Sequence, residues 1–195
     1  MRGAPALTPA APKTPNLSDE DLAHAWIAGD EAAFRTLFDR WRDPVLGYAW
    51  RMLRRREEAE EVCVDAFCRI VEGRWQPSGG FRAYIFTVAH RLCLDRIRRR
   101  GRWSRVRTLL RADDGGASSP EAAAINDQRL NRLEKAIAAL PDQHRAAVLL
   151  FYRQEMPSRE VADILDMSDQ QLRSALSYAR RRLRKELNPA EEVSP

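Results

Sequence analysis

Apolar side chains recur every three or four residues through almost the whole chain. This helical period constrains the fold more than any other feature of the sequence. The clearest stripe consists of Phe81, Tyr84, Ile85, Val88, Ala89, Leu92, Cys93 and Ile97. No segment alternates apolar and polar residues over a length that would indicate a strand. The sequence therefore predicts an all-α protein.

Capping residues, prolines and glycines divide this pattern into helices. Asp30 is expected to cap one helix, Asp43-Pro44 to start another that runs through Met52, and Gly73 to end a third. Between 101 and 119 the periodicity is lost in a Gly- and Ser-rich stretch. We therefore predict two small helical bundles joined by a flexible linker. The predicted boundaries are a disordered tail over 1–17, a first bundle over 18–101, the linker over 102–119, a second bundle over 120–187 and a C-terminal tail over 188–195.

The charge of the chain is basic and unevenly distributed. The formal net charge is +5, and arginines crowd the segments 91–107 and 173–184. Such clusters favour a polyanionic partner. Three cysteines, an odd number, argue against a disulfide framework. No apolar run is long enough for a signal peptide or a membrane span, so we expect a cytoplasmic protein that does not insert into membranes.

The second bundle contains a helix-turn-helix pattern, in which a short helix over 158–165 is followed by a tight turn and a longer helix over 168–187. Ser168 and Gln171 form a capping box that fixes the start of the longer helix. In this motif the second helix lies in the major groove of DNA. A solvated basic helix end would give a similar pattern. The candidate DNA contacts are Ser168, Asp169, Gln170, Gln171, Arg173, Ser174, Ser177, Tyr178, Arg180 and Arg181.

A second candidate surface lies in "FRAYIFTVAHRLCLDRIRRRGRW", where an aromatic start precedes a basic end. Aromatic rings stack on unpaired bases and arginines follow phosphates, which suits a single strand. Phe81 and Tyr84 also fit a core stripe, so we expect the polar face to make the contacts. Its residues are Arg82, Thr87, His90, Arg91, Asp95, Arg98 and Arg99.

Taken in order, these segments resemble the extracytoplasmic-function (ECF) sigma factors of the bacterial sigma-70 family, over about residues 20–187. "AAFRTLFDRWRDPVLGYAWRMLRRREEAEEVCVDAFCRIVEG" is similar to the segment of the family that binds core RNA polymerase. The aromatic and basic segment resembles the helix that reads the −10 element, and the helix-turn-helix resembles the domain that reads the −35 element. The resemblance implies polymerase contacts at Glu60, Glu61, Val64, Asp65, Phe67 and Arg69.

The resemblance also implies the partners and the mode of action. They are core RNA polymerase, promoter DNA as duplex at −35 and as a melted strand at −10, and an anti-sigma factor. It implies no catalysis, cofactor or metal. Val64, Tyr84 and Arg91 differ from the usual family residues, as do Ala175 and Tyr178 in the helix-turn-helix. The difference at Val64 weakens the implied polymerase contact there, and the difference at Arg91 leaves open which −10 base is read. The differences at Ala175 and Tyr178 imply either a −35 preference unlike that of most members or a weaker −35 contact.

Other functions explain less of the sequence than a sigma factor does. A stand-alone helix-turn-helix regulator leaves the first bundle without a role, and a helical protein-interaction module leaves the arginine clusters unexplained. The two alternatives that stay open are this stand-alone regulator and a degenerate sigma paralogue that binds polymerase but reads promoters poorly. A metal or redox sensor built from Cys63, Cys68, Cys93, His24 and His90 lacks the spacing of metal ligands. An enzyme is disfavoured because the chain has no phosphate-binding loop or catalytic triad.

Overall fold

The computed structural model describes residues 17–74, 80–110 and 125–187. Within these ranges every regular element is a helix, which confirms the all-α prediction. Most of both predicted tails and the segment 111–124, which holds part of the predicted linker, lie outside the described residues.

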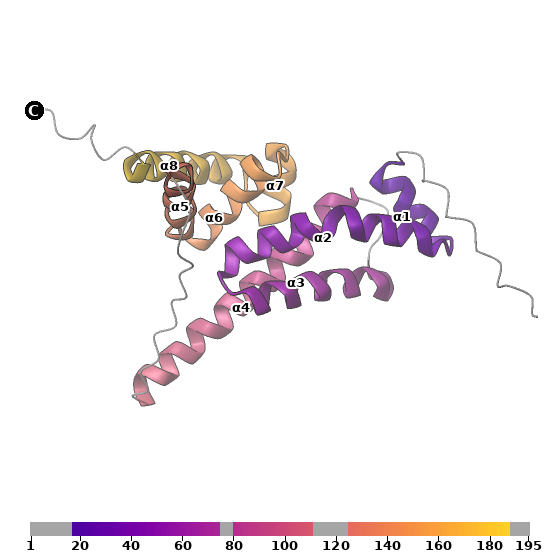
Figure 1. The fold of residues 1–195 in the computed structure, drawn as a ribbon, viewed down its shortest axis with the longest axis horizontal. Helices are drawn as coiled ribbons and strands as arrows, with labels where there is room; N and C mark the ends of the chain where they lie inside the picture. The colour runs from indigo at the N-terminus through magenta and orange to yellow at the C-terminus, as the bar shows by residue number, and fades with distance from the viewer. Residues whose placement is uncertain (1–16, 75–79, 111–124, 188–195) are drawn as a thin grey trace, which may run out of the picture.

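The first bundle contains four α-helices. They are α1 (Asp19–Ile27), α2 (Glu31–Leu53), α3 (Arg56–Arg69) and α4 (Phe81–Leu110), and a π-helical turn η1 (Ile70–Arg74) extends α3. Helix α2 packs along α3 and α1, and α4 contacts all three (Figure 1). The core between them is aromatic. Tyr48, Phe81 and Phe86 are each no more than 1% exposed, and the Phe86 ring meets Tyr48 and Trp41 edge to face.

Local signals in the sequence set the ends of these helices. The Asp30 carboxylate accepts hydrogen bonds from the main-chain N–H groups of Ala32 and Ala33, at 2.9 and 3.3 Å, which confirms the predicted cap. Gly73, inside η1, leaves the helical conformation with a φ of +74°, which glycine adopts without steric cost. The predicted end at Gly73 is therefore confirmed as well.

The predicted break at Asp43-Pro44 is wrong, because α2 continues through both residues. Proline has no N–H, so the carbonyl of Arg40 loses its usual helical partner, at a cost of about 3 kcal/mol. Packing on the far side of the proline offsets this cost, since Val45 and Tyr48 are almost completely buried. Tertiary contacts thus keep the helix continuous where the local sequence favours a new start.

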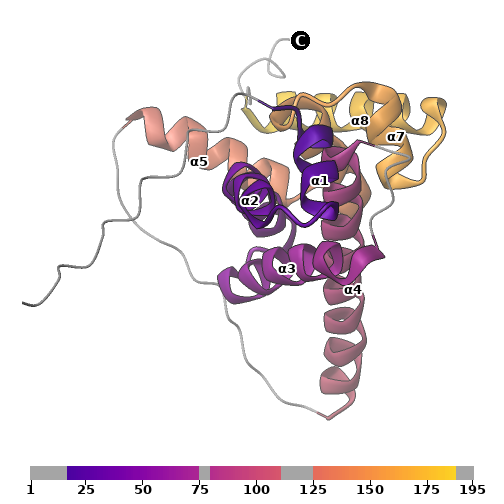
Figure 2. The same cartoon turned by 90° about the vertical axis from the view of Figure 1, so that its right-hand side faces the viewer.

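Helix α4 is longer than the sequence predicts. It continues past Gly101 to Leu110, into the range assigned above to the linker. The apolar stripe ends near Ile97 because the later part of the helix leaves the bundle. Figures 1 and 2 both show this end of α4 projecting away from the other helices. An apolar period reports packing against other elements, so it does not mark the part of a helix that extends beyond its bundle.

The second bundle consists of α5 (Ile125–Ala138), α6 (Asp142–Val148), the π-helical turn η2 (Leu149–Arg153), α7 (Ser158–Leu165) and α8 (Asp169–Leu187). Helices α7 and α8 form the predicted helix-turn-helix. The capping box is confirmed: Ser168 Oγ accepts from the N–H of Gln171 at 3.2 Å, and Gln171 Oε1 accepts from the N–H of Ser168 at 2.7 Å. Asp166 ends α7 in the left-handed conformation, with a φ of 53°, and so makes the tight turn.

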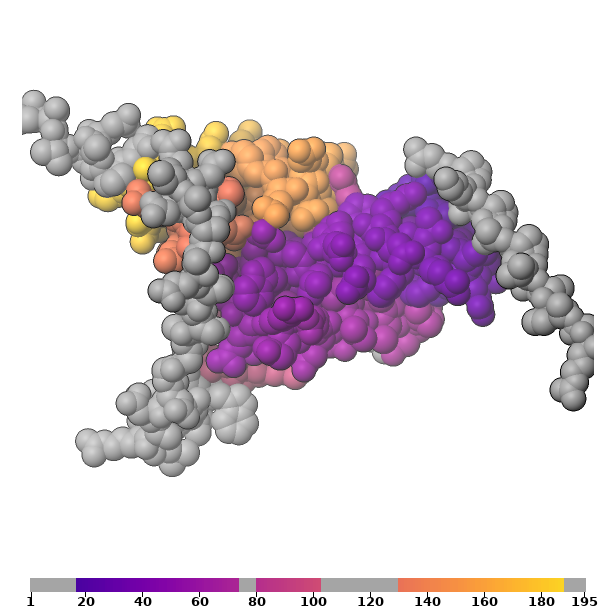
Figure 3. Space-filling model, viewed as in Figure 1, coloured from indigo at the N-terminus to yellow at the C-terminus, as the bar shows by residue number. Residues whose placement is uncertain are grey.

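The two bundles pack against each other. Helix α7 lies on α4, and α6 lies near α2. In the space-filling view the orange atoms of the second bundle rest directly on the purple first bundle, and yellow α8 lies at the outer edge (Figure 3). Because the bundles pack side by side, one compact unit carries the candidate surfaces of both.

Candidate DNA- and polymerase-binding surfaces

Helix α8 has one buried and one open face. Its buried face consists of Leu172, Ala175, Leu176 and Ala179. The candidate DNA contacts that lie exposed are Ser168, Asp169, Gln170, Gln171, Arg173, Ser174, Ser177, Arg180 and Arg181. Residues 170, 173, 174 and 177 follow the helical period, so they form one continuous polar strip. Amide, hydroxyl and guanidinium groups on such a strip can bond the edges of bases.

Two differences from the usual family pattern, Ala175 and Tyr178, are less exposed than the residues of this strip. Ala175 is 4% exposed and belongs to the core. Tyr178 is half-buried, and its ring packs against that of His144 with centroids 4.7 Å apart. The structure therefore places Ala175 in the packing of the bundle rather than among the exposed side chains.

On helix α4 a smaller share of the candidate DNA contacts is exposed than on α8. Arg91, Arg98, Arg99 and Asp95 are exposed, and the carboxylate of Asp95 accepts from Arg99 at 2.8 Å. Thr87 is half-buried, and its hydroxyl donates to the carbonyl of Ala83 in its own helix at 2.7 Å. The open part of the predicted strand-binding face is therefore its second half.

His90 was predicted on this open face, and the structure corrects that prediction. The ring is 4% exposed, and its Nδ1 shares a hydrogen bond of 2.8 Å with the Tyr48 hydroxyl. Burial and then the charges of Arg91 and Arg98 lower the pKa of His90 to about 4. The ring is therefore neutral at ordinary pH and acts within the core. A polar side chain within a wide apolar stripe can be buried when a buried partner forms a hydrogen bond with it.

Arg82 lies in the first turn of α4 and forms an ion pair with the other bundle. Its Nε and Nη2 donate to the two carboxylate oxygens of Glu160 on α7, at 3.3 and 2.7 Å. This fork geometry fixes both side chains. Of the candidates on α4, Arg82 is thus the one held by the helix-turn-helix.

The candidate polymerase surface on α3 combines carboxylates with an exposed apolar residue. Val64 is 59% exposed, although it is apolar. Glu61 and Asp65 both accept from Arg96 Nη2 of α4, at 3.4 and 2.9 Å. Glu60 accepts from Arg56 one turn earlier, at 2.8 Å.

The remaining two candidates on α3 face differently. Phe67 was predicted as a polymerase contact, and the structure corrects this. It is 3% exposed and packs on Phe38 and Phe34, with ring centroids 4.7 and 6.3 Å away. Arg69 is half-buried. The available part of the surface is therefore the first three turns of α3.

No pattern in the sequence indicates two residues that organise these surfaces, Arg96 and Glu160. Arg96 joins α4 to α3, and Glu160 joins α7 to α4, over separations of more than thirty and seventy residues. Periodicity reports which side of a helix faces inward, but it does not report which charged residue of another helix lies opposite.

Comparison with known proteins covers both bundles. The family model described as Sigma-70 region 2 matches residues 37–102, and that described as Sigma-70, region 4 matches residues 130–183. The ECF sigma factor SigE of Mycolicibacterium smegmatis is 30% identical over 176 residues, which cover 86% of this chain and 68% of SigE. SigW of Bacillus subtilis is 26% identical over 174 residues, covering 82% of this chain and 91% of SigW. The chain belongs to the sigma-70 family, in its ECF class.

The fold of this ECF sigma factor is also found in solved structures. The sigma factor RpoE of Bartonella quintana, solved with the anti-sigma factor NepR, has a TM-score of 0.66 at 18% identity, over 80% of this chain and 98% of RpoE. CnrH, solved with the cytosolic domain of CnrY, has a TM-score of 0.66 at 19% identity, over 88% of this chain and 98% of CnrH. Both similarities cover the two bundles.

The structure also describes the residues that a metal site, a redox site or a membrane span would need. Among the described residues, no three His, Cys, Asp or Glu side chains come together in a way that could hold a metal ion. Cys63 and Cys93 are buried free thiols, and Cys68 is an exposed one. Within 17–74, 80–110 and 125–187, no helix has the length and apolar character needed to span a membrane.

Proposed function

We propose that this ECF sigma factor binds core RNA polymerase and directs it to promoters through separate −10 and −35 surfaces. The observation that carries the proposal is the presence of region 2 and region 4 in one chain, each with an open polar face. Two weak readers on one scaffold gain affinity through effective concentration.

The polar strip of α8 suits duplex DNA at −35. In a helix-turn-helix the first turns of the second helix reach base edges, and its later residues meet phosphates. Gln170 and Arg173 are exposed in those first turns and can bond adenine and guanine in two places each. Arg180 and Arg181 are exposed further along and suit phosphates.

The exposed second half of the α4 face suits the melted −10 strand. Arg91, Arg98 and Arg99 supply guanidinium groups that stack on bases or pair with phosphates. Unstacking costs a few kcal/mol per step, and each stacked base returns about 1–3 kcal/mol. Capture of exposed bases therefore helps to hold the duplex open.

Polymerase binding is assigned to α3, where Glu60, Glu61 and Asp65 surround Val64. An apolar side chain that is 59% exposed among carboxylates suits a partner surface with an apolar pocket and basic rim. The site of action is then the cytoplasm, where polymerase transcribes the chromosome. An anti-sigma factor is the expected regulator, as in the RpoE–NepR structure. The role is one of binding, without a catalytic residue.

The test is transcription in vitro from a library of genomic fragments, with core polymerase and the purified protein. New RNA starts that share a two-part upstream motif would support the proposal. Arg173→Ala should weaken use of the upstream half by about 1–3 kcal/mol, and Arg91→Ala should affect only the downstream half. Asp163→Ala, at an exposed position of α7, is the matched control.

Two other outcomes decide against the proposal. Stable polymerase binding without initiation would assign the chain as a degenerate paralogue. Salt-sensitive duplex binding without polymerase binding would assign it as a stand-alone regulator.

A further inference from the structure

One acidic residue stands within the most basic helix of the chain. The sequence of α4 contains nine arginines and a single carboxylate, that of Asp95. Arg91, Arg98 and Arg102 are exposed and lie four residues before, three after and seven after Asp95, so they share its face of the helix. A carboxylate on this face repels phosphates, so a face that only followed the DNA backbone would gain nothing from it.

Asp95 does not serve to neutralise arginines that pack inside the first bundle. Those arginines pair with carboxylates of α3: Arg96 Nη2 lies 2.9 Å from Asp65 Oδ2, and Arg100 Nη2 lies 3.3 Å from Glu58 Oε2. The carboxylate of Asp95 is on the outer side, where the side chain is 52% exposed. Its position therefore calls for an explanation on the open face.

On that face Asp95 pairs with Arg99, one turn further along α4. Arg99 Nη2 lies 2.8 Å from Asp95 Oδ2, and the Arg99 side chain is 65% exposed. An exposed pair of this kind adds little to the stability of a helix. It does fix the direction of the carboxylate. Each carboxylate oxygen accepts two hydrogen bonds, so both oxygens can still bond a ligand while Arg99 holds one of them.

The chemistry of a carboxylate limits which base it can bond. An ionised carboxylate only accepts hydrogen bonds, and the bases of a melted strand expose their Watson–Crick edges. Guanine offers two donors side by side on that edge, the ring N–H and the amino group, which match the two oxygens of a carboxylate. Cytosine and adenine each place an amino donor beside a ring-nitrogen acceptor, and thymine places one N–H between two carbonyls. Guanine alone therefore forms two hydrogen bonds with a carboxylate.

We propose that Asp95 selects guanine at one position of the melted −10 strand, and that Arg99 is the residue that positions its carboxylate. This inference rests on the proposed function, because it assigns a base preference to the −10 surface. The guanidinium of Arg99 also offsets the repulsion between Asp95 and the phosphates beside the selected base. The neighbouring arginines then supply affinity, and the carboxylate supplies discrimination.

The test is selection of single-stranded oligodeoxynucleotides with a randomised central segment, bound by the full chain together with core polymerase. Sequencing of the bound strands should show one position at which guanine binds about tenfold more tightly than the other bases. Asp95→Asn should remove most of this preference, since the amide presents a donor to one of the two guanine donors. It should also bind strands without guanine slightly more tightly, because the negative charge is lost.

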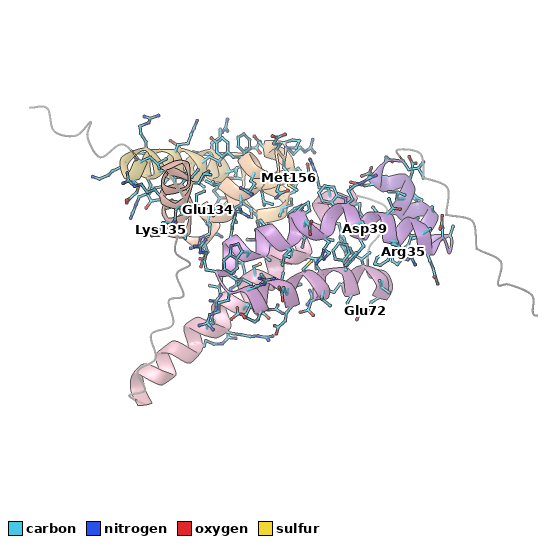
Figure 4. All side chains as sticks on the ribbon, in the orientation of Figure 1. Arg35, Asp39, Glu72, Glu134, Lys135 and Met156 are labelled. Atoms are coloured by element: carbon cyan, nitrogen blue, oxygen red, sulfur yellow. The ribbon has the colours of Figure 1, made fainter. Side chains whose placement is uncertain are left out.

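This opposite response separates base selection from a role in helix stability. A less stable helix would weaken the binding of all strands alike. Asp39→Asn is the matched control, because Asp39 is an exposed aspartate of α2 at the opposite end of the first bundle from the projecting end of α4 (Figure 4). It should leave the guanine preference unchanged. Equal guanine enrichment by the wild-type protein and Asp95→Asn would overturn the proposal.

Variants of Arg99 test the positioning. Arg99→Gln removes the charge that holds the carboxylate and should reduce the guanine preference, whereas Arg99→Lys keeps a charge there and should retain most of it. An unchanged preference in Arg99→Gln would overturn the role given to Arg99. Bound strands with no sequence preference at any position would instead refute the −10 surface of the proposed function, and the role of Asp95 with it.

Discussion

Helices α4 and α8 are both assigned to promoter reading, yet they are held in different ways. Helix α8 packs through one face, and its opposite face carries the exposed strip from Ser168 to Arg181. Helix α4 contacts α1, α2, α3 and α7, so only part of its circumference is open. When a helix is buried on one face only, its apolar period predicts which residues are exposed. When a helix has several neighbours, the period no longer predicts this.

The largest effect is expected for a core substitution in α4, the helix with several neighbours. Phe86→Ala should lower the free energy of unfolding by about 3–5 kcal/mol, because the ring is fully buried between Trp41 and Tyr48. Ser177→Ala on the open face of α8 should change it by less than about 0.5 kcal/mol. Urea denaturation measures both, and similar losses in the two variants would contradict the contrast between the helices.

The pH dependence of stability tests the burial of His90 on α4. The folded-state pKa is about 4 and the ordinary value is 6.5, so the unfolded chain binds a proton first as the pH falls. Stability from this group is therefore complete above pH 6.5 and is lost between pH 6.5 and 4, by about 3 kcal/mol. His90→Gln should flatten this part of the curve.

The two helices also explain how much the sequence could predict. The bounds of α7, the capping box of α8 and its open face follow from local signals, because the candidate contacts on that face are exposed in the described structure. The burial of His90 and Phe67 depends on partners far along the chain, Tyr48 and Phe38. The same is true of the continuity of α2 through Pro44. Local patterns predict an element well when its packing is simple, and they fail where several elements meet.

A smaller effect is expected where the bundles meet at Arg145. Its Nη2 donates to the carbonyls of Ala138 and Leu140, and its Nη1 donates to that of Met52. Arg145→Lys should cost about 2 kcal/mol, since an ammonium group cannot reach three carbonyls in this geometry. Arg153→Lys, at an exposed position nearby, is the control. Thermal unfolding of both variants tests this, and equal stability would mean that the three carbonyls find other donors.

The smallest effect separates capping from DNA contact at Ser168. Ser168→Ala removes the acceptor for the N–H of Gln171 and should cost about 1 kcal/mol of stability. Ser168→Asp keeps an acceptor at the cap and adds a negative charge to the first turn, which favours the helix but repels phosphates. We therefore expect the alanine variant to lose stability, and the aspartate variant to keep stability and lose affinity for −35 duplex. If both variants lost stability and affinity together, the start of α8 would depend on the serine hydroxyl itself, and its open face would not be independent of its cap.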